Sequence, residues 1–428
     1  MLLTSPYWLY QALRHGKYHA GLPQRLGRVP ARLARNRKSE RLIWVHAVSV
    51  GEVLAVSGLV EAIRRRFPEH RILVSTTTDT GQAVAGKCFG EENVFYFPLD
   101  FAFAIRSYLA ALQPELVVLA ETEFWPNFLR LAHESGAGIA LVNGRISDRS
   151  WPNYRRFRFA LTEMLSQVDL FLTQTEQDAE RLRTIGAPSE RVQVTGNLKF
   201  DVSVPPLPAI VETLRVSLAT ENAGPVLVCG STLESEEALL LEAFRNVRSV
   251  HPRAVMMLAP RRPERFDDVA NLIAASGLPF FRRSQWQRES LAGSVLLLDS
   301  IGELAALYAL ADIAFVGGSL VRRGGHNIIE PAQYGVAIVV GPHTHNFRDI
   351  VTQFRSRDAV RIVGRRELAP MFLRLLADDG ERQALGQRAQ ETVRSQMGAT
   401  ERTIAAIQNL LGADHSAQAP SAAAAHNH

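Results

Sequence analysis

Short apolar runs alternate with helix-length stretches of mixed polarity along most of the chain. In the first half, the apolar runs are Leu42–Val45, Ile72–Ser75, Val94–Phe97, Leu116–Leu119, Ile139–Val142, Leu170–Thr173 and Val192–Thr195. In the second half, they are Val226–Cys229, Val255–Leu258, Val295–Leu298, Ile313–Val316 and Ile338–Val340. Short, fully apolar strands separated by helices are typical of parallel sheets that are covered on both faces. The pattern therefore predicts an α/β fold with two doubly wound, Rossmann-like domains that face each other across a cleft.

A proline-rich segment at residues 202–208 (VSVPPLP) interrupts this rhythm, and we interpret it as the linker between the domains. It places an N-terminal domain at residues 41–201 and a C-terminal domain with terminal helices at residues 209–411. Residues 1–40 form a separate basic segment. The Ala-, Ser- and His-rich residues 412–428 are expected to be disordered.

The charge of the chain is concentrated at its start. The formal net charge is +5, but residues 1–40 hold eight Lys and Arg against one Glu, so their surplus of +7 leaves −2 for the rest. A basic segment that also carries Tyr7, Trp8 and Tyr10 suits an anionic membrane surface, although a solvated arm without a partner is the alternative. Nucleic-acid binding is disfavoured because the positive charge does not spread over the body of the protein.

Composition excludes several other classes. No apolar run approaches the ~20 residues that a membrane span needs, so a soluble-type globular chain is expected. Cys88 and Cys229 lie far apart without ligand-like neighbours, which favours a reducing, cytoplasmic compartment and no metal site. The stretch Leu2–Leu13 lacks the leading charges and the cleavage site of a signal peptide.

The motif HAVSVGE follows the first predicted strand and opens a helix, which places Glu52 in the first helical turn. A carboxylate held there by the helix dipole stays ionised and is a candidate general base. The letters Ser49-x-x-Glu52 also spell a capping box, so a purely structural role remains the alternative. Gly51 is a poor helix former and favours the close approach of a ligand, which makes Ser49 and Gly51 candidate binding residues.

The motif ETEFWPN follows the fourth strand and offers Glu121 and Glu123 on the same side of an extended chain. They form a possible catalytic pair, or one of them caps the next helix. The segment after the fifth strand interleaves arginines with aromatic residues, a composition that suits phosphate groups as well as a solvated surface. Its arginines are Arg145, Arg149, Arg155, Arg156 and Arg158.

Three strand ends of the second half offer groups for a nucleotide. Ser231 follows one strand and Arg261 the next, and a glycine-rich segment, GGSLVRRGGHNIIEPA, follows a third. Its glycines let backbone N–H groups approach an anion, and Glu330 can accept hydrogen bonds from two ribose hydroxyls. Each motif alone is also an ordinary turn, or, for Ser231-x-x-Glu234, a helix cap. The candidates are Lys199, Ser231, Thr232, Arg261, Gly317, Gly318, Ser319, Gly325, His326, Asn327 and Glu330.

Together the motifs HAVSVGE, ETEFWPN, NGRISDRS, GNLKFD, APRR and GGSLVRRGGHNIIEPA closely resemble those of the bacterial Kdo transferases, the 3-deoxy-D-manno-octulosonic acid transferases of lipid A biosynthesis. The resemblance runs from about Lys17 to Leu411. It implies a GT-B glycosyltransferase that moves Kdo from CMP-Kdo to a hydroxyl of the lipid A precursor, with inversion and without a metal or cofactor. It also implies Glu52 as the general base. The implied CMP-holding residues are Ser231, Arg261, Gly318, Asn327 and Glu330.

The resemblance implies a place at the cytoplasmic face of the inner membrane. Members of the family usually begin with a longer apolar segment than Leu2–Leu13, so we expect either peripheral attachment through the basic N-terminus or a truncated start. Two other functions fit a similar architecture. One is a sugar-nucleotide epimerase, which needs a second acid/base residue, and the other is a non-catalytic sugar-nucleotide sensor.

Overall fold

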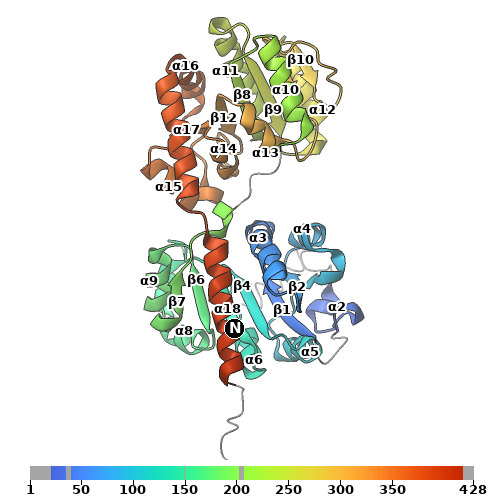
Figure 1. Cartoon of the computed structure of the whole chain (residues 1–428), viewed down its shortest axis with the longest axis vertical. Helices are drawn as coiled ribbons and strands as arrows, with labels where there is room; N and C mark the ends of the chain where they lie inside the picture. Colours follow the sequence, from blue (N-terminus) through green and yellow to red (C-terminus); the bar gives the residue numbers. More distant parts are fainter. Residues whose placement is uncertain (1–20, 35–39, 149, 202–206, 418–428) are drawn as a thin grey trace, which may run out of the picture. The chain divides into compact units, whose positions relative to one another are not determined.

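The structure is a computed structural model that describes residues 21–34, 40–148, 150–201 and 207–417 (Figure 1). The described residues divide into two compact units, with chain crossings between Val202 and Ser203 and between Ser395 and Gln396. Each unit is built on a seven-stranded parallel sheet. The predicted α/β class and the predicted pair of doubly wound sheets are therefore confirmed.

Unit 1 contains the first sheet, with strand order β3-β2-β1-β4-β5-β6-β7. Its direction of winding reverses between β1 and β4, which pair from Ile43 opposite Leu116 to His46 opposite Leu119. In doubly wound sheets, ligands bind beyond the carboxyl ends of the strands at this reversal. Its strands are β1 (Arg41–His46), β2 (His70–Thr76), β3 (Val94–Tyr96), β4 (Leu116–Ala120), β5 (Gly138–Gly144), β6 (Leu170–Thr173) and β7 (Val192–Val194).

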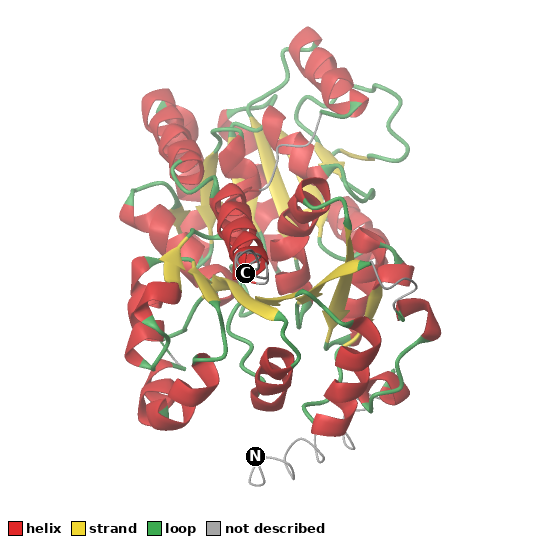
Figure 2. Cartoon of the chain, turned by 60° about the horizontal axis from the view of Figure 1, so that its bottom comes forward, coloured by secondary structure: helices red, strands yellow, loops and turns green. Residues whose placement is uncertain are grey.

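Helices cover both faces of this sheet (Figure 2) because side chains alternate along each strand. Leu42 and Trp44 of β1 belong to the hydrophobic cluster on one face, and Ile43 and Val45 belong to the cluster on the other. The helices and short 3₁₀ segments are α2 (Leu22–Arg25), η1 (Ala31–Leu33), α3 (Val50–Arg66), α4 (Asp79–Phe89), η2 (Glu91–Asn93), α5 (Ala102–Leu112), α6 (Pro126–Glu134), α7 (Trp151–Arg156), α8 (Arg158–Leu165), α9 (Glu176–Thr184), η3 (Ser189–Arg191), η4 (Leu198–Asp201) and α18 (Ala399–Ala417).

Unit 2 contains the second sheet, with strand order β10-β11-β9-β8-β12-β13-β14. Its winding reverses between β8 and β12, which pair from Leu227 opposite Ile313 to Gly230 opposite Val316. The strands are β8 (Val226–Thr232), β9 (Val255–Pro260), β10 (Phe280–Arg282), β11 (Val295–Leu297), β12 (Ile313–Val316), β13 (Ala337–Val340) and β14 (Arg361–Ile362). The helical segments are α10 (Ala209–Thr220), α11 (Glu236–Val250), η5 (Pro263–Arg265), α12 (Phe266–Ala275), α13 (Leu304–Leu307), η6 (Tyr308–Leu310), α14 (Ile329–Gln333), η7 (His345–Phe347), α15 (Arg348–Ser356), η8 (Arg365–Glu367), α16 (Leu368–Ala377) and α17 (Asp379–Arg394).

The last helix, α18, belongs to unit 1, which corrects the expected C-terminal domain of residues 209–411. Its apolar residues Ile407 and Leu411 are buried in the same cluster as Ile63 of α3. At its start, Asp201 accepts the backbone N–H of Gly398 at 2.6 Å. These contacts explain why the chain returns to the first sheet after α17.

Two further expectations change at the ends of the chain. Residues 412–417, expected to be disordered, continue α18, and residues 418–428 lie outside the described part. In the basic segment, Arg25 is buried, donates to the carbonyl of Thr77 at 2.7 Å and lies over the ring of Tyr96. Arg25 is therefore used in the packing of unit 1, while residues 1–20, 35–39 and 202–206 lie outside the described part.

Within the described ranges, no helix combines the length and the apolar character needed to cross a bilayer.

Candidate active site

Glu52 lies in the first turn of α3, directly beyond the carboxyl end of β1. One of its carboxylate oxygens accepts the backbone N–H of Val48 at 2.8 Å, and the other accepts the hydroxyl of Ser49 at 2.8 Å. Ser49 is the N-cap of α3, yet its side chain caps no backbone N–H of the helix. A full capping box is therefore absent at this position, and the hydroxyl of Ser49 orients the carboxylate instead.

The pKa of Glu52 is raised, first by burial and then by the negative charge of Glu121. The Val48 N–H, the Ser49 hydroxyl and the ammonium of Lys199 act in the opposite direction and lower it. A raised pKa makes a carboxylate a stronger base, and three opposing groups keep its ionised form accessible. Glu52 thus has the orientation and the electrostatic surroundings of a general base.

Glu121 directly follows β4 and has a left-handed backbone, φ 57°, which is unusual for a residue with a side chain. Its carboxylate lies 3.4 Å from Nε of Arg145 and 3.7 Å from Nζ of Lys199. Non-glycine residues in this conformation cost about 1–3 kcal/mol and are concentrated at functional sites. The structure therefore brings Glu121 and two cations together, and Lys199 lies in unit 1 with the carboxylates.

Glu123 has a different environment from Glu121. Its pKa is raised to about 7, first by burial and then by the negative charges of Glu52 and Glu121. Near neutral pH, Glu123 therefore exchanges a proton with its surroundings. Among the described residues, Glu123 makes no ion pair.

The remaining predicted residues of this half differ in what they offer. A side chain at Gly51 would meet only the Ser49 hydroxyl, at 3.9 Å, so packing does not require glycine there. This open backbone agrees with the expected approach of a ligand. Arg145 is paired with Glu121, and Arg149 lies outside the described residues.

Two residues near these carboxylates were missed in the sequence. Asn143 has a left-handed backbone, φ 54°, and its buried Nδ2 has no hydrogen-bond partner among the described residues. Its Oδ1 accepts the backbone N–H of Leu198 at 3.1 Å, so the residue is fixed beside Lys199. Tyr154 lies near Glu123, because burial and then the charge of Glu123 raise the pKa of its phenol. Asn143 opens the motif NGRISDRS, and its position before Gly144 was the sequence feature that could have drawn attention to it.

In unit 2, the glycine-rich loop after β12 does not present an open anion site. The carboxylate of Glu236, fully buried at the start of α11, accepts the backbone N–H groups of Gly318 at 2.6 Å, Ser319 at 3.0 Å and Leu320 at 2.9 Å. It also accepts the N–H of Leu233 at 2.9 Å. The donors that we expected to reach an external anion are therefore occupied by a carboxylate of the protein itself.

Three other predicted residues are used for packing. The buried hydroxyl of Thr232 donates to Glu237 at 3.1 Å, and the hydroxyl of Ser319 donates to the carbonyl of Val316 at 2.6 Å. A side chain at Gly317 would lie 2.5 Å from the backbone oxygen of Ser231, so close strand contact requires glycine there. These interactions correct the expectation that Thr232, Ser319 and Gly317 face a ligand.

The predicted helix cap at Ser231-x-x-Glu234 is also absent. α11 begins at Glu236, and its N-cap is Ser235. Ser231 itself is only partly buried and has a left-handed backbone, φ 54°, at the end of β8. It remains a candidate binding residue at the reversal point of the sheet.

A second group of predicted residues does come together. Arg261 lies close enough to His326 and Glu330 for its charge to lower both pKa values, although burial is the larger influence on each. Burial raises the pKa of Glu330, and Asn327 donates to this carboxylate at 3.3 Å. Gly325, which precedes His326, has a left-handed backbone with φ 75°, and its backbone N–H donates to the carbonyl of Gly318 at 2.8 Å.

His326 has a pKa lowered to about 4, by burial and then by Arg261. At neutral pH it is therefore uncharged, so it offers this site an imidazole nitrogen and not a cation. Its Nε2 is buried without a hydrogen-bond partner among the described residues. A side chain at Gly318, φ 71°, would lie 2.9 Å from this nitrogen, so glycine keeps the imidazole in place.

Two tyrosines near Glu330 could not be recognised from the sequence. Tyr308 is buried, and its pKa is raised well above its usual value by burial and then by Glu330. The pKa of Tyr334 is raised by the same two causes, and its buried hydroxyl has no partner among the described residues. Arg261, His326, Asn327 and Glu330 with these hydroxyls can bind a ligand that carries both hydroxyl groups and negative charge.

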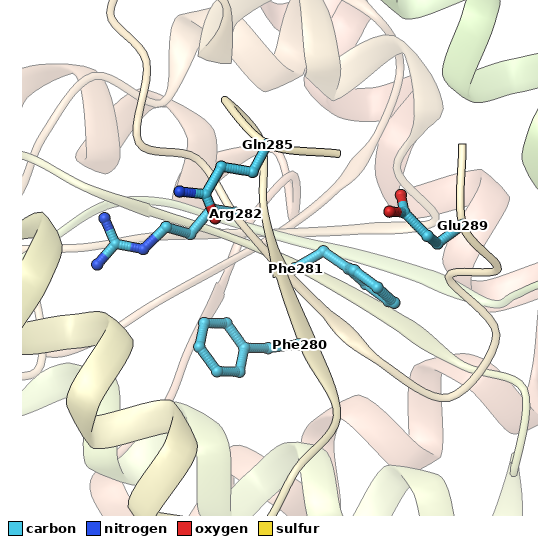
Figure 3. A pocket seen from close by; sticks show the side chains of 5 residues that line it. All are labelled: Phe280, Phe281, Arg282, Gln285 and Glu289. Atoms are coloured by element: carbon cyan, nitrogen blue, oxygen red, sulfur yellow. The ribbon is translucent and has the colours of Figure 1, made fainter. Parts of the chain in front are cut away.

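Neither group of residues lines the cavity drawn in Figure 3, which has a volume of about 230 Å³. Phe280 and Arg282 lie on one side of edge strand β10, and Phe281 points to the other side. Gln285 and Glu289 complete the lining. In the parts of the chain that the structure describes, no three His, Cys, Asp or Glu side chains are grouped as metal ligands would be.

Comparison with known proteins adds sequence relatives and structural neighbours. The family described as 3-deoxy-D-manno-octulosonic-acid transferase (kdotransferase) matches residues 20–202. A 3-deoxy-D-manno-octulosonic acid transferase from Bordetella pertussis is 37% identical over 421 residues, which cover 95% of this chain and 96% of the relative.

Among solved structures, UDP-GlcNAc 2-epimerase from Neisseria meningitidis is similar with a TM-score of 0.56 and 12% identity, covering 86% of this chain and 100% of the epimerase. A glycosyltransferase from Rickettsia africae is similar with a TM-score of 0.54 and 13% identity, covering 87% of this chain and 98% of the transferase. These neighbours confirm the expected GT-B type of fold. The fold is shared by epimerases and transferases, so it does not separate the two activities.

Proposed function

The chain belongs to the 3-deoxy-D-manno-octulosonic acid (Kdo) transferase family, and from this membership we propose that it transfers Kdo from CMP-Kdo to a hydroxyl of the lipid A precursor. The chain is a glycosyltransferase, which sets aside the epimerase and sensor alternatives as its main activity. The observation that carries the proposal is the position of Glu52, whose carboxylate is oriented by Ser49 and lies near Glu121, Glu123 and Lys199. This position is at the carboxyl end of β1, where the winding of the first sheet reverses.

The donor would bind in unit 2. Glu330 accepts hydrogen bonds from the ribose hydroxyls, and Asn327 already holds its carboxylate. Arg261 supplies positive charge for the phosphate of CMP, and the neutral imidazole of His326 offers a nitrogen that is not otherwise bonded. Because Glu236 occupies the N–H groups of the glycine-rich loop, we assign the phosphate to Arg261 and not to this loop.

The acceptor would bind in unit 1. Glu52 removes the proton of the acceptor hydroxyl while that oxygen forms a bond to the anomeric carbon of Kdo. The bond from this carbon to the phosphate oxygen breaks, and CMP leaves with the electron pair from the opposite face, so the configuration inverts. The proton is then held by Glu52 until another group takes it up. Oriented carboxylates of this kind typically contribute 10²–10⁴-fold to a rate.

The two neighbouring carboxylates have separate parts in this proposal. Glu121, paired with Arg145 and Lys199, positions the two cations beside the base. Glu123, with a pKa of about 7, can accept the proton from Glu52 and release it to solvent. Arg145 and Lys199 would hold the phosphorylated sugar of the acceptor, and the arginine-rich segment that begins at Arg145 has a composition that suits phosphate groups.

We further propose that the reaction needs neither a metal nor a cofactor, because Arg261 can stabilise the charge that develops on the leaving phosphate. We place the protein at the cytoplasmic face of the inner membrane, since its acceptor is a lipid and residues 1–40 carry a surplus of seven positive charges. The attachment would be peripheral, through anionic lipid.

Mass spectrometry of the lipid A precursor after incubation with CMP-Kdo and the purified full chain tests this function. A gain of one or more Kdo masses is expected, with the same yield in EDTA. Loss of the product in EDTA would contradict the metal-free reaction. Consumption of CMP-Kdo without any gain by the acceptor would contradict the transfer, and conversion of the sugar nucleotide without acceptor would indicate an epimerase.

A further inference from the structure

Helices α7 and α8 carry an unusual exposed surface, here called the α7–α8 surface, made of residues Arg155–Phe159. Each of its five residues is exposed, and Phe157 and Phe159 expose 60% and 80% of their surfaces. The following Ala160 is exposed as well. Single exposed apolar residues are ordinary, but two nearly free phenylalanines in one five-residue stretch indicate a contact that the isolated chain does not make.

The same surface is positively charged. Arg155, Arg156 and Arg158 make no ion pair among the described residues, and Glu163 is the only acidic residue between positions 150 and 166. The guanidinium groups of Arg156 and Arg158 lie over the rings of Phe157 and Phe159, 5.9 and 4.9 Å from the ring centroids. Arginine beside exposed aromatic rings is the combination found where a protein lies in the headgroup region of an anionic bilayer.

A cavity of about 420 Å³ opens beside Phe157 and is lined by Ser150, Asn153, Tyr154, Phe157 and Leu161. Its volume falls within the roughly 300–1,000 Å³ of sites that bind small ligands. Tyr154, one of the lining residues, contacts the ring of Phe124 edge-on at 6.0 Å between centroids, and the pKa of its phenol is raised by burial and then by the charge of Glu123. The α7–α8 surface therefore lies on the part of unit 1 that carries Glu123.

We propose that the α7–α8 surface docks on an anionic lipid bilayer, with Phe157 and Phe159 inserted between the headgroups and the arginines against lipid phosphates. This inference rests on the proposed function, because it explains how Glu123 and the neighbouring Glu52 reach an acceptor that stays in the membrane. The charge complementarity of three unpaired arginines selects anionic lipid as the occupant. A protein partner at this surface is an outcome that the test below can reveal.

The test reports the local environment of residue 159 in the full chain. The exposed Cys88 is first replaced by serine, so that the buried Cys229 is the one native cysteine left. In this Cys88→Ser background, Phe159→Cys introduces a cysteine that is labelled with a polarity-sensitive dye. Ile301→Cys, at a position with 79% exposure against 80% for Phe159, is the matched control. With vesicles of phosphatidylglycerol and phosphatidylethanolamine, the dye at 159 is expected to shift to shorter wavelengths, and the dye at 301 to stay unchanged.

Several results would overturn the inference. One is sedimentation of the protein with vesicles while the dye at 159 does not respond, because another segment would then hold the membrane. Others are an equal response at 301 and an equal response to phosphatidylcholine vesicles, which carry no net charge. A response at 159 to a protein but not to lipid would also overturn it and indicate a protein partner.

A pair of charge reversals gives an independent measurement. Arg158→Glu is expected to lower the vesicle-bound fraction by about fivefold or more, and Arg65→Glu, at another exposed arginine, in α3, is expected to leave it unchanged. Equal binding by the two variants would contradict the proposal. Transfer of Kdo by the wild-type protein to a deacylated, water-soluble acceptor is measured separately, so a failure of the proposed function appears there and not in the vesicle experiments.

Discussion

The ammonium of Lys199 lies 3.7 Å from the carboxylate of Glu121, in unit 1 and beside the proposed base. The sequence suggested that this cation serves the donor nucleotide. Its position instead makes it an electrostatic partner of Glu121 and of Glu52, whose pKa it lowers.

Replacing Lys199 with Met is therefore expected to move the acid limb of the pH profile of kcat/KM to higher pH. Loss of the positive charge disfavours the ionised form of Glu52, so its pKa rises and less base is available at a given pH. Lys199→Arg retains the charge and is the control that should keep the limb in place. An unshifted limb in Lys199→Met would show that Lys199 does not act on the base.

The free energy of unfolding of unit 1 is expected to fall between pH 5 and pH 8 in the wild type, and to fall by less in Glu123→Gln. The pKa of Glu123 is raised from its usual 4.5 to about 7 in the folded protein, so the folded state binds the proton more tightly. This contribution is present below pH 4.5 and is lost as the pH rises through 7. A shift of this size corresponds to about 3 kcal/mol at most, and solvent screening lowers it.

Thermal unfolding at both pH values measures this effect. Glu163→Gln, at an exposed position of α8, is the control and should follow the wild type. If Glu123→Gln and wild type lose stability equally between the two pH values, Glu123 does not hold a proton with a raised pKa.

Glu236→Ala is expected to destabilise unit 2 by about 3 kcal/mol or more. The substitution leaves the N–H groups of Gly318, Ser319 and Leu320 buried without an acceptor, and each unsatisfied group costs about 1–3 kcal/mol. Glu234→Ala, an exposed residue two positions earlier, should change stability by less than about 0.5 kcal/mol. Urea unfolding of the two variants compares them directly, and similar midpoints would refute a structural role for Glu236.

His326 is expected to remain neutral across the working pH range. Its pKa is lowered to about 4 by burial and by Arg261, so it does not charge between pH 8 and pH 5.5. Titration of CMP against the protein at several pH values should give the same pH dependence for wild type and His326→Gln. A change in wild-type affinity with a midpoint near 6.5, absent from the variant, would mean that the imidazole is exposed and titrates normally.

The regular part of the fold was predictable because its signal is local. Each predicted strand is present, since a short, fully apolar run between helices leaves few alternatives. β10 and β14 were missed because they are three and two residues long and include arginine. The return of α18 to unit 1 was also missed. Its apolar positions would suit either sheet, and only the packing of Ile407 near Ile63 decides between them.

The site was predictable where the chemistry depends on residue type and neighbours in the sequence, as for Glu52 and Glu330. It was not predictable where a distant residue takes the expected contact. Glu236 lies 82 positions before Gly318 in the sequence, and no local pattern around either residue predicts the hydrogen bond between them. The difference between Glu121 and Glu123 was hidden for the same reason, because it depends on the burial of one and on the two cations that reach the other.

The central claim is that Glu52 removes the acceptor proton, and the turnover of Glu52→Gln measured together with its affinity for CMP tests it most directly. The amide retains the size of the side chain and can still accept hydrogen bonds, so CMP affinity should stay within about twofold of wild type. Turnover should fall by about 10²–10⁴. Wild-type turnover by a variant that still binds CMP would contradict the claim and would leave Glu52 as a residue that only orders the start of α3.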